Sequence, residues 1–274
     1  MTTADLDIIS LLGKQLGRAI PEVPRSELHA SQLAYSADGG RVVALSLRGC
    51  ALRKVPEAVW ALDALQVLSV GENEIEVLSA RIGELTELRE FFLFNCPVTS
   101  LPEELGNLSK LEILDLGHNK LTSIPESIGR LSNLRFLYLS DNQLSALPDS
   151  LGDLESLGYL SMTDNQFSEL PASVTRLQRL MELRIYNNKI AKLPEAIGRL
   201  GQLRELHARG NLLAELPETI GELRNLYYLD LRGNRLLETP NSLVNLQQLR
   251  KLDLRWNRIM VPPKWPGNSC MVYV

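Results

Sequence analysis

Residues that could perform catalysis or hold a metal ion are few in this chain, and they are scattered. Its histidines are His29, His118 and His207, and its cysteines are Cys50, Cys96 and Cys270. The spacings typical of phosphate-binding loops, dinucleotide-binding loops, zinc-binding helices, C-x-x-C pairs and serine nucleophile elbows do not occur. If each lies on a strand of one sheet, as argued below, His118 and His207 are roughly 20 Å apart at the usual spacing between strands. That distance is too large for them to share a metal. We therefore expect no catalytic residue, cofactor site or metal site, and no enzymatic activity.

Aromatic and arginine side chains, by contrast, recur at a regular spacing. Arg209, Arg232 and Arg255 follow one another at steps of 23 residues. The same step separates Phe136 from Tyr159. Side chains of these two kinds carry much of the binding free energy at protein interfaces. The constant step indicates a repeated structural unit that presents them on one surface.

The step of 23 residues also governs the apolar residues of the chain. They recur at Val42, Leu65, Leu88, Leu111, Leu134, Leu157, Leu180, Leu203, Leu226 and Leu249. From Leu111 to Leu134 the unit reads L-x-x-L-x-L-x-x-N-x-L and then x-x-I-P-x-x-I-G-x-L. A core built ten times in this way explains why leucine makes up 55 of the 274 residues. Such a period is the signature of a solenoid.

The unit resembles the leucine-rich repeat family, in its intracellular type with 23-residue units, over about residues 42 to 263. The resemblance points to a bacterial source and implies an α/β solenoid. Its expected form is a right-handed horseshoe with a parallel sheet on the concave side and short helices or 3-10 turns on the convex side. The alternation Leu114-Asp115-Leu116 predicts a strand with one buried face. Pro125 suits the first position of a helical turn, and the acid after it suits the positive end of the helix dipole.

An asparagine column accompanies the leucines and is expected to satisfy backbone groups that the solenoid buries. It consists of Asn73, Asn119, Asn142, Asn165, Asn188, Asn211, Asn234 and Asn257. Cys50 and Cys96 replace it in two repeats, and we interpret them as small buried residues of the same column. Two repeats separate them, about 10 Å, which is too far for a disulfide. Free thiols fit a reducing compartment.

The two ends of the chain depart from the repeat, as caps over the last apolar layers must. Residues 1–41 are expected to form an N-terminal helical cap, in which Thr2-x-x-Asp5 has capping-box form and Gly17 ends the helix. Its apolar residues at helical spacing are Leu6, Ile9, Leu12 and Leu16.

At the other end, the repeats are expected to occupy residues 42–263. The last repeat should lack its helix, because Pro262, Pro263 and Pro266 crowd that stretch. Residues 264–274 are expected to form a C-terminal cap with a short final strand. Two interpretations stay open, a complete protein and a chain truncated before a further domain.

The net charge, the apolar runs and the first residues of the chain indicate which classes of protein it does not belong to. The formal charge of -4 offers no basic excess for a nucleic acid backbone. No apolar run approaches the roughly 18 residues that a membrane-spanning helix needs. The first residues carry acids where a signal peptide carries bases. We expect a cytoplasmic monomer that binds neither nucleic acid nor membrane, with export by an unconventional route left open.

Strand side chains alternate, so Ile113, Asp115 and Gly117 should point to the concave side, with His118 at its rim. Eight of the 15 aromatic residues fall on such positions, namely Phe92, Phe94, Phe136, Tyr138, Tyr159, Tyr186, Tyr228 and Trp256. Aromatic residues are favoured in strands in general, and this preference could explain each ring taken on its own. Their clustering in neighbouring repeats favours a contact surface.

The arginine column of the same face has two possible explanations. Arginines stacked about 5 Å apart repel one another unless something acidic lies among them. Asp230 and Asp253 in the neighbouring column could neutralise them as an internal charge ladder. Alternatively, the column could dock an acidic partner.

The sequence therefore predicts a non-enzymatic protein-protein interaction module that binds a partner protein on its concave face. The candidate partner-binding residues are Phe92, Phe94, Phe136, Tyr138, Tyr159, Arg184, Tyr186, His207, Arg209, Tyr228, Arg232, Arg255 and Trp256. Repeats of this type resemble those that bind Ras-like GTPases or other signalling proteins. The opening residues, including Leu16 and Gly17, are similar to the start of the repeat arm of Roco-type GTPases. The alternative is a regulatory or substrate-recognition arm of a GTPase, kinase or ligase system whose catalytic part lies outside this chain.

Overall fold

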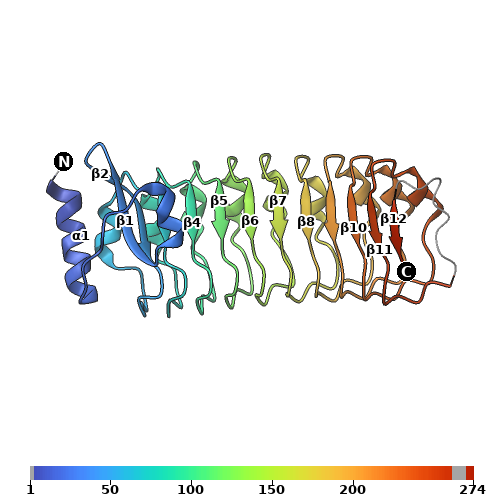
Figure 1. The fold of residues 1–274 in the computed structure, drawn as a ribbon, viewed down its shortest axis with the longest axis horizontal. Helices are drawn as coiled ribbons and strands as arrows, with labels where there is room; N and C mark the ends of the chain where they lie inside the picture. Colours follow the sequence, from blue (N-terminus) through green and yellow to red (C-terminus); the bar gives the residue numbers. More distant parts are fainter. Residues whose placement is uncertain (1–2, 261–269) are drawn as a thin grey trace. The chain divides into compact units, whose positions relative to one another are not determined.

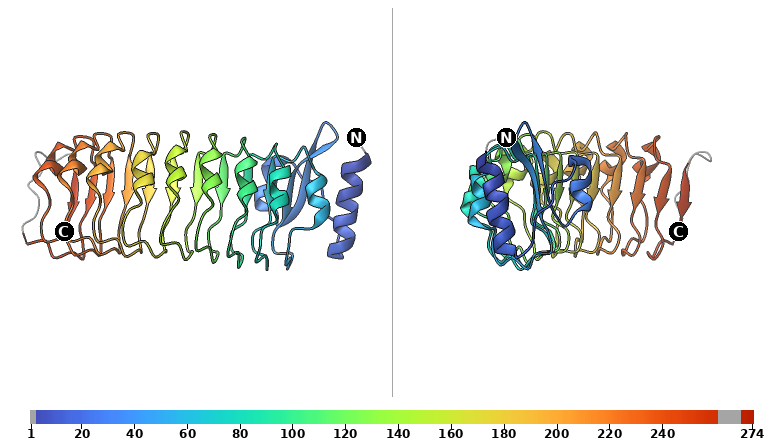
Figure 2. Two further views of the ribbon diagram at one scale, coloured as in Figure 1. Left: turned by 180° about the vertical axis from the view of Figure 1, so that it is seen from behind. Right: turned by 60° about the vertical axis from the view of Figure 1, so that its left-hand side comes forward.

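A computed structural model of the chain describes residues 3–260 and 270–274. It divides into two compact units, Met1–Leu134 and Arg135–Val274, which are described separately. Both units are stacks of repeats, each with one short strand and one 3-10 helix. The strands of each unit lie side by side (Figure 1), and the helical turns lie on the opposite side (Figure 2). Within the described ranges, no helix is both long and apolar enough to cross a membrane.

The first unit begins with helix α1 (Thr3–Leu16), as its apolar periodicity predicts. Leu12 is fully buried, and Gly17 ends the helix with a φ of +68°, which residues with a side chain seldom adopt. The 3-10 helix η1 (Arg25–Ala30) follows.

Asp5, expected in a capping box, fastens α1 to the first strand of the repeats. Its carboxylate accepts a hydrogen bond from the Val42 backbone N–H at 2.8 Å and pairs with the Arg41 guanidinium at 3.0 Å. Thr2, the expected partner of Asp5 in the capping box, lies outside the described residues. A buried carboxylate is stable only with such partners.

A β-hairpin joins the N-terminal cap to the first repeat, where the sequence predicts a helical cap alone. β1 (Leu33–Asp38) pairs antiparallel with β2 (Arg41–Leu47). Gly39 and Gly40 form the turn with φ angles of +56° and +83°. Two-residue hairpin turns of this type need positive φ at both positions, which glycine adopts freely. The Gly-Gly pair between two apolar runs is the signal that the helical interpretation overlooked.

The remaining repeats of the first unit each add one parallel strand. Their strands are β3 (Val67–Ser69), β4 (Glu90–Phe92) and β5 (Ile113–Asp115). Their 3-10 helices are η2 (Glu57–Ala61), η3 (Ala80–Glu84), η4 (Glu103–Asn107) and η5 (Glu126–Arg130). β2 to β5 pair in parallel in chain order.

The second unit continues the same pattern. Its strands are β6 (Phe136–Tyr138), β7 (Tyr159–Ser161), β8 (Glu182–Arg184), β9 (Glu205–His207), β10 (Tyr228–Asp230), β11 (Lys251–Asp253) and β12 (Met271–Tyr273). Its 3-10 helices are η6 (Asp149–Asp153), η7 (Ala172–Arg176), η8 (Glu195–Arg199), η9 (Glu218–Glu222) and η10 (Asn241–Asn245). Strands β6 to β12 pair in parallel in chain order.

β12 pairs with β11 and matches the short terminal strand that the sequence predicts. The expected loss of the last helix at Pro262, Pro263 and Pro266 lies outside the described residues. The proposed boundaries between caps and repeats stay predictions.

The fold class expected from the sequence, an α/β solenoid of parallel strands and short 3-10 turns, is confirmed in both units. The turns begin one residue later than expected, since Pro125 precedes η5 and Glu126 is its first residue. Glycine allows these turns to pack closely. A Cβ added to Gly106 would lie 2.5 Å from the Cβ and the backbone oxygen of Ser127, too close for any side chain.

The asparagine column has its expected role. The Asn119 amide donates to the carbonyls of Leu93 at 2.7 Å and Leu116 at 2.9 Å, and its oxygen accepts from the Val98 N–H at 3.2 Å. Cys96 occupies the equivalent place and is buried, as expected, which raises the pKa of its thiol. Cys50, also expected to be buried, is only partly so, because it stands in the first repeat.

The strands have a core side and a second side, which is open in β6 but buried in β3. In β6, Leu137 is fully buried, whereas Phe136 and Tyr138 are half-buried. We call the side of the strands that faces away from the leucine core the strand face. It is the surface that the sequence analysis expects to be concave.

Candidate functional site

The strand face of the first unit carries Phe92 and Phe94, and both rings contact other side chains of that unit. The His29 ring meets Phe92 edge-on, with centroids 5.4 Å apart, and its Nε2 lies 3.3 Å from Glu90. The Arg48 guanidinium lies 5.1 Å from the centroid of Phe94. The two rings are therefore partly covered from within the chain.

Three rings of the second unit form a continuous apolar surface on β6 and β7, which we call the aromatic cluster: Phe136, Tyr138 and Tyr159. The Tyr159 ring lies 4.8 Å from that of Tyr138 and 6.2 Å from that of Phe136, measured between centroids. Arg184 on β8 lies over Tyr159 at 5.5 Å. Burial raises the pKa of Tyr159, so its hydroxyl stays neutral at physiological pH.

A pocket of about 620 Å³ opens beside the aromatic cluster, and we call it the Gly158 pocket. Phe136, Tyr159 and Met181 give it apolar walls, and Arg135 and Arg179 also line it. Arg135, Gly158 and Met181 occupy the same position in three successive repeats, and Gly158 has no side chain there. A Cβ at Gly158 would lie 3.2 Å from the terminal methyl group of Met181. The missing side chain therefore makes part of the space.

Two arginines of the predicted column are neutralised within the chain. Arg232 contacts Asp230 through both Nε, at 2.8 Å, and Nη2, at 2.6 Å. Arg255 contacts Asp253 in the same way, at 2.9 and 2.6 Å. Burial opposes ionisation of Asp230, but the hydrogen bonds from Arg232 outweigh it and hold its pKa below the usual value. These pairs form the internal charge ladder, the first of the two explanations that the sequence leaves open.

Arg209 stands in the same column but outside that ladder. Its guanidinium carbon lies 4.6 Å from the centroid of the Tyr186 ring. Within the described part of the chain, no carboxylate lies within ion-pair distance of it. The neighbouring column presents His207 at this repeat instead of an aspartate. Arg209 is thus a cation held in place by an aromatic ring and available to an anionic group.

Strands β8 and β9 bring together three side chains that the sequence analysis did not connect. His207 Nε2 lies 3.0 Å from Glu205 Oε2 and 3.7 Å from Glu182 Oε1. Glu182 and Glu205 are paired residues of adjacent strands. Both glutamates are absent from the predicted site. Their signal in the sequence is the spacing of 23 residues, with His207 two residues further along the same face.

The remaining predicted residues lie near the C-terminal end of the second unit. Tyr228 packs edge-on against His207, with centroids 5.0 Å apart, and the Lys251 ammonium lies 4.8 Å from the Tyr228 centroid. Trp256 is 73% exposed, and Arg255 lies 5.7 Å from its ring. Tyr228 is thus integrated into the face, whereas Trp256 projects from it.

The rim of the strand face is shaped by the backbone. The same position of every repeat has positive φ, at Gly49, Glu72, Asn95, His118, Asp141, Asp164, Asn187, Gly210, Gly233 and Trp256. Glycine, asparagine and aspartate tolerate this left-handed conformation best. Most residue types of this column, including the polar ones, therefore follow from backbone geometry.

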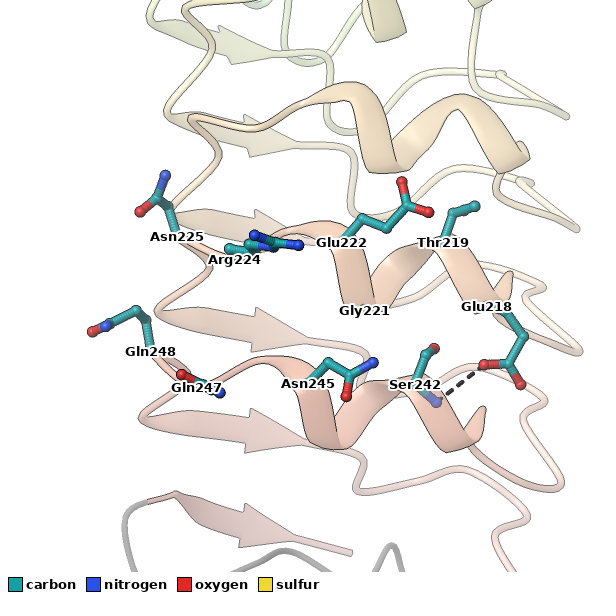
Figure 3. Close-up of a pocket in the computed structure, with 10 residues that line it drawn as sticks. All are labelled: Glu218, Thr219, Gly221, Glu222, Arg224, Asn225, Ser242, Asn245, Gln247 and Gln248. Carbon is teal, nitrogen blue, oxygen red and sulfur yellow. Dashed lines mark hydrogen bonds between the residues drawn. The ribbon is translucent and has the colours of Figure 1, made fainter.

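A second, polar pocket of about 750 Å³ lies between η9 and η10 on the side of the helical turns (Figure 3). Figure 3 marks one hydrogen bond in this pocket, which the Ser242 N–H donates to Glu218 at 3.0 Å. The Ser127 N–H bonds to Glu103 at the same distance in the first unit. Because this bond recurs between turns, it serves the packing of repeats and marks no site.

Comparison with known families agrees with the architecture. A family model described as a leucine-rich repeat region matches residues 126–211, and two models described as leucine-rich repeats match residues 86–144 and 225–246. The chain is a leucine-rich repeat protein. No curated protein sequence matches it.

Solved structures with similar folds include two plant receptors and a bacterial internalin. The ectodomain of the plant membrane receptor kinase GASSHO1/SCHENGEN3 from Arabidopsis thaliana, in complex with CASPARIAN STRIP INTEGRITY FACTOR 2, is 30% identical with a TM-score of 0.73, over 86% of this chain and 30% of that chain. The plant peptide hormone receptor RGFR1, in complex with RGF2, is 30% identical with a TM-score of 0.66, over 75% and 34%. An internalin (inlF) from Listeria monocytogenes shares the fold at 23% identity and a TM-score of 0.58, over 92% and 82%. The chain spans about a third of the length of the two plant receptors.

Proposed function

We propose that this leucine-rich repeat protein is a non-enzymatic interaction module that binds a partner protein on the strand face of its second unit. The main observation behind this proposal is the aromatic cluster of Phe136, Tyr138 and Tyr159 beside the Gly158 pocket, whose walls are partly apolar and partly charged. Half-buried rings next to a pocket are typical of the anchors that dominate interface energies. The two plant receptors were solved in complex with CASPARIAN STRIP INTEGRITY FACTOR 2 and with RGF2, which supports a binding role for this fold.

Charged groups around the cluster would orient the partner. Arg184 and Arg209 stand on the same face, each stacked on a tyrosine ring, and Arg209 has no carboxylate partner among the described residues. Arg232 and Arg255 are held by Asp230 and Asp253, so their contribution would be to keep the face rigid. We therefore place the centre of the interface between the aromatic cluster and Arg209.

The wider set of predicted residues completes this proposal. Tyr186, His207, Tyr228 and Trp256 would extend the interface along the second unit, and Phe92 and Phe94 would offer a separate contact in the first unit. The type of repeat suggests a signalling protein such as a Ras-like GTPase as the partner, in the cytoplasm, bound by a monomer.

Affinity capture with matched variants tests the proposal. The wild-type chain and a Phe136→Ala/Tyr159→Ala variant are used as baits, and the dissociation constant of the captured protein is then measured. Loss of both rings should weaken binding by about 2 kcal/mol or more, which is at least roughly 30-fold. The control is Arg199→Ala, an exposed residue of η8 on the side of the helical turns. Equal affinity of the wild type and the double variant, with both folded, would refute the proposed site.

A regulatory arm of a larger enzyme is the second candidate. It is favoured by the match to the ectodomain of a membrane receptor kinase, of which this chain spans 30%. The mass of the native protein in its own cells discriminates between the two. A mass near 30.6 kDa supports the separate module, and a much larger mass supports the arm.

A further inference from the structure

We propose that Glu182, Glu205 and His207 form a binding site for a divalent transition-metal ion such as Zn²⁺ on the strand face of the second unit. The three side chains offer one imidazole nitrogen and two carboxylate oxygens, and these atoms lie within 4.8 Å of one another. This site goes beyond the proposed protein-binding function, because it concerns a small inorganic ligand and needs no partner.

The types of ligand indicate the class of metal. Carboxylates alone favour Ca²⁺ or Mg²⁺, which prefer oxygen ligands. An imidazole nitrogen together with carboxylates suits Zn²⁺ and similar transition-metal ions, and three protein ligands leave a fourth position open. We therefore expect Zn²⁺ to bind more tightly than Ca²⁺ or Mg²⁺.

The strands position the ligands with little freedom. Glu182 and Glu205 are partners in the register of β8 and β9, and His207 follows Glu205 by two residues on the same face. The distances from His207 Nε2 to the two carboxylates are 3.0 and 3.7 Å. Ligands that surround a tetrahedral Zn²⁺ at about 2.0–2.2 Å lie about 3.3–3.6 Å from one another. An ion therefore fits after small rotations of the side chains.

Charge in this region also favours a cation. Like charges directly opposite each other on adjacent strands destabilise the sheet. Arg184 compensates Glu182, with its Nε 2.6 Å from Glu182 Oε1. Among the described residues, Glu205 has no lysine or arginine partner, and its carboxylate pairs with His207. A dication between the two carboxylates would remove their repulsion.

The imidazole is held in place from its other sides. The Tyr228 ring contacts it edge-on at 5.0 Å, and the His207 side chain is only 16% exposed. Asp230, which faces His207 in the register of β9 and β10, is occupied by Arg232. The neighbouring groups thus leave Nε2 directed at the two glutamates.

The simpler interpretation is a set of ion pairs in which His207 bridges the glutamates without any metal. Arg184 distinguishes the two possibilities, because it competes with a metal for Glu182. Its guanidinium could keep its contact with Tyr159, 5.5 Å away, when a metal takes the carboxylate. Removing Arg184 should therefore strengthen metal binding.

Calorimetric titration of the untagged full chain with Zn²⁺ tests the site. We expect one equivalent to bind to the wild type. His207→Ala and the isosteric Glu205→Gln should each weaken binding by more than about 10-fold, since even outer-sphere residues matter by that much. His29→Ala is the matched control, because His29 also packs edge-on against an aromatic ring but has only Glu90 beside it. Unchanged affinity in His207→Ala, or no stoichiometric binding to the wild type, overturns the proposal.

Two further measurements test which side chains hold the metal and whether Arg184 competes with it. The absorption spectrum of the Co²⁺-loaded chain should lack thiolate charge-transfer bands, which would appear if Cys50 or Cys270 held the ion. Arg184→Gln should bind Zn²⁺ more tightly than the wild type. Thiolate bands, or weaker binding by Arg184→Gln, would contradict the assignment.

Discussion

The guanidinium of Arg209 lies 4.6 Å above the ring of Tyr186, and it pairs with no carboxylate among the described residues. One repeat further along, Arg232 in the same column is locked to Asp230 by two hydrogen bonds. The two arginines share a strand position but serve different purposes. Arg232 neutralises buried charge, and Arg209 is available for recognition.

This difference predicts unequal effects on stability. Arg232→Ala would leave Asp230, 2% exposed, without its partner and would remove a neighbour 3.6 Å from Asp253, which is fully buried. Uncompensated buried charge costs about 3–5 kcal/mol. Arg209→Ala should cost about 1 kcal/mol, since it removes a single half-buried cation–π contact and leaves no buried charge unpaired. Urea unfolding followed by circular dichroism measures both, and equal losses would show that the charge ladder is not stabilising.

Arg209 should contribute more to binding when the surface of the partner is more negatively charged. Arg209→Glu is expected to slow association with the captured partner and to make binding less dependent on salt, because rim charges act on encounter rates. Surface plasmon resonance at two ionic strengths measures this effect. Arg199→Glu, on η8, has the same change of charge away from the strand face. If both variants behave alike, Arg209 does not contact the partner.

The Gly158 pocket should close when a side chain fills it. Gly158→Val is expected to keep the fold, because the nearest atom to an added Cβ is the flexible methyl end of Met181, at 3.2 Å. It should weaken partner binding by roughly 10-fold or more, about 1.4 kcal/mol, if an apolar side chain of the partner enters the pocket. Gly201→Val is the control, because no atom lies within 4 Å of a Cβ added there. Binding that survives Gly158→Val would place the anchor elsewhere.

The buried carboxyl group of Asp115 should make the stability of the folded protein depend on pH in the acidic range. Burial raises its pKa, and the hydrogen bond from the Gly117 N–H, 3.0 Å long, opposes this only in part. The unfolded chain has a pKa of about 3.9 at this group, so stability falls as pH rises from there through the higher folded value. Asp115→Asn keeps an acceptor for Gly117 and should therefore unfold at higher urea concentration than the wild type at pH 7.

The same variant should lose its advantage near pH 3, where the aspartate is protonated in both states. Urea midpoints at the two pH values measure this change. Asp38→Asn, an exposed position at the end of β1, controls for the removal of a negative charge. A gain that is independent of pH would mean that burial of Asp115 is not its cause.

Much of the fold could be predicted from the sequence because the determining interactions recur at a constant step. Each repeat must bury its leucines and satisfy its backbone in the same way, so ten copies reinforce one pattern. Asn119 illustrates this, since its amide makes the bonds that its place in the unit requires. The features that break the repeat were harder to predict. The hairpin is one of them: Gly39 and Gly40 signal its turn, but the apolar residues before them have helical spacing and predict a helical cap.

Alternation along the strands and the step of 23 residues are enough to assign the candidate side chains to the strand face. Which of them act together depends on the folded arrangement of their side chains. The Gly158 pocket depends on where the Met181 side chain lies, and the grouping of His207 with two glutamates depends on rotamers at strands β8 and β9. Such relationships depend on distances of a few ångströms between side chains of different repeats. The spacing of residues in the sequence predicts which residues lie opposite each other on neighbouring strands, but it does not predict the rotamers of their side chains.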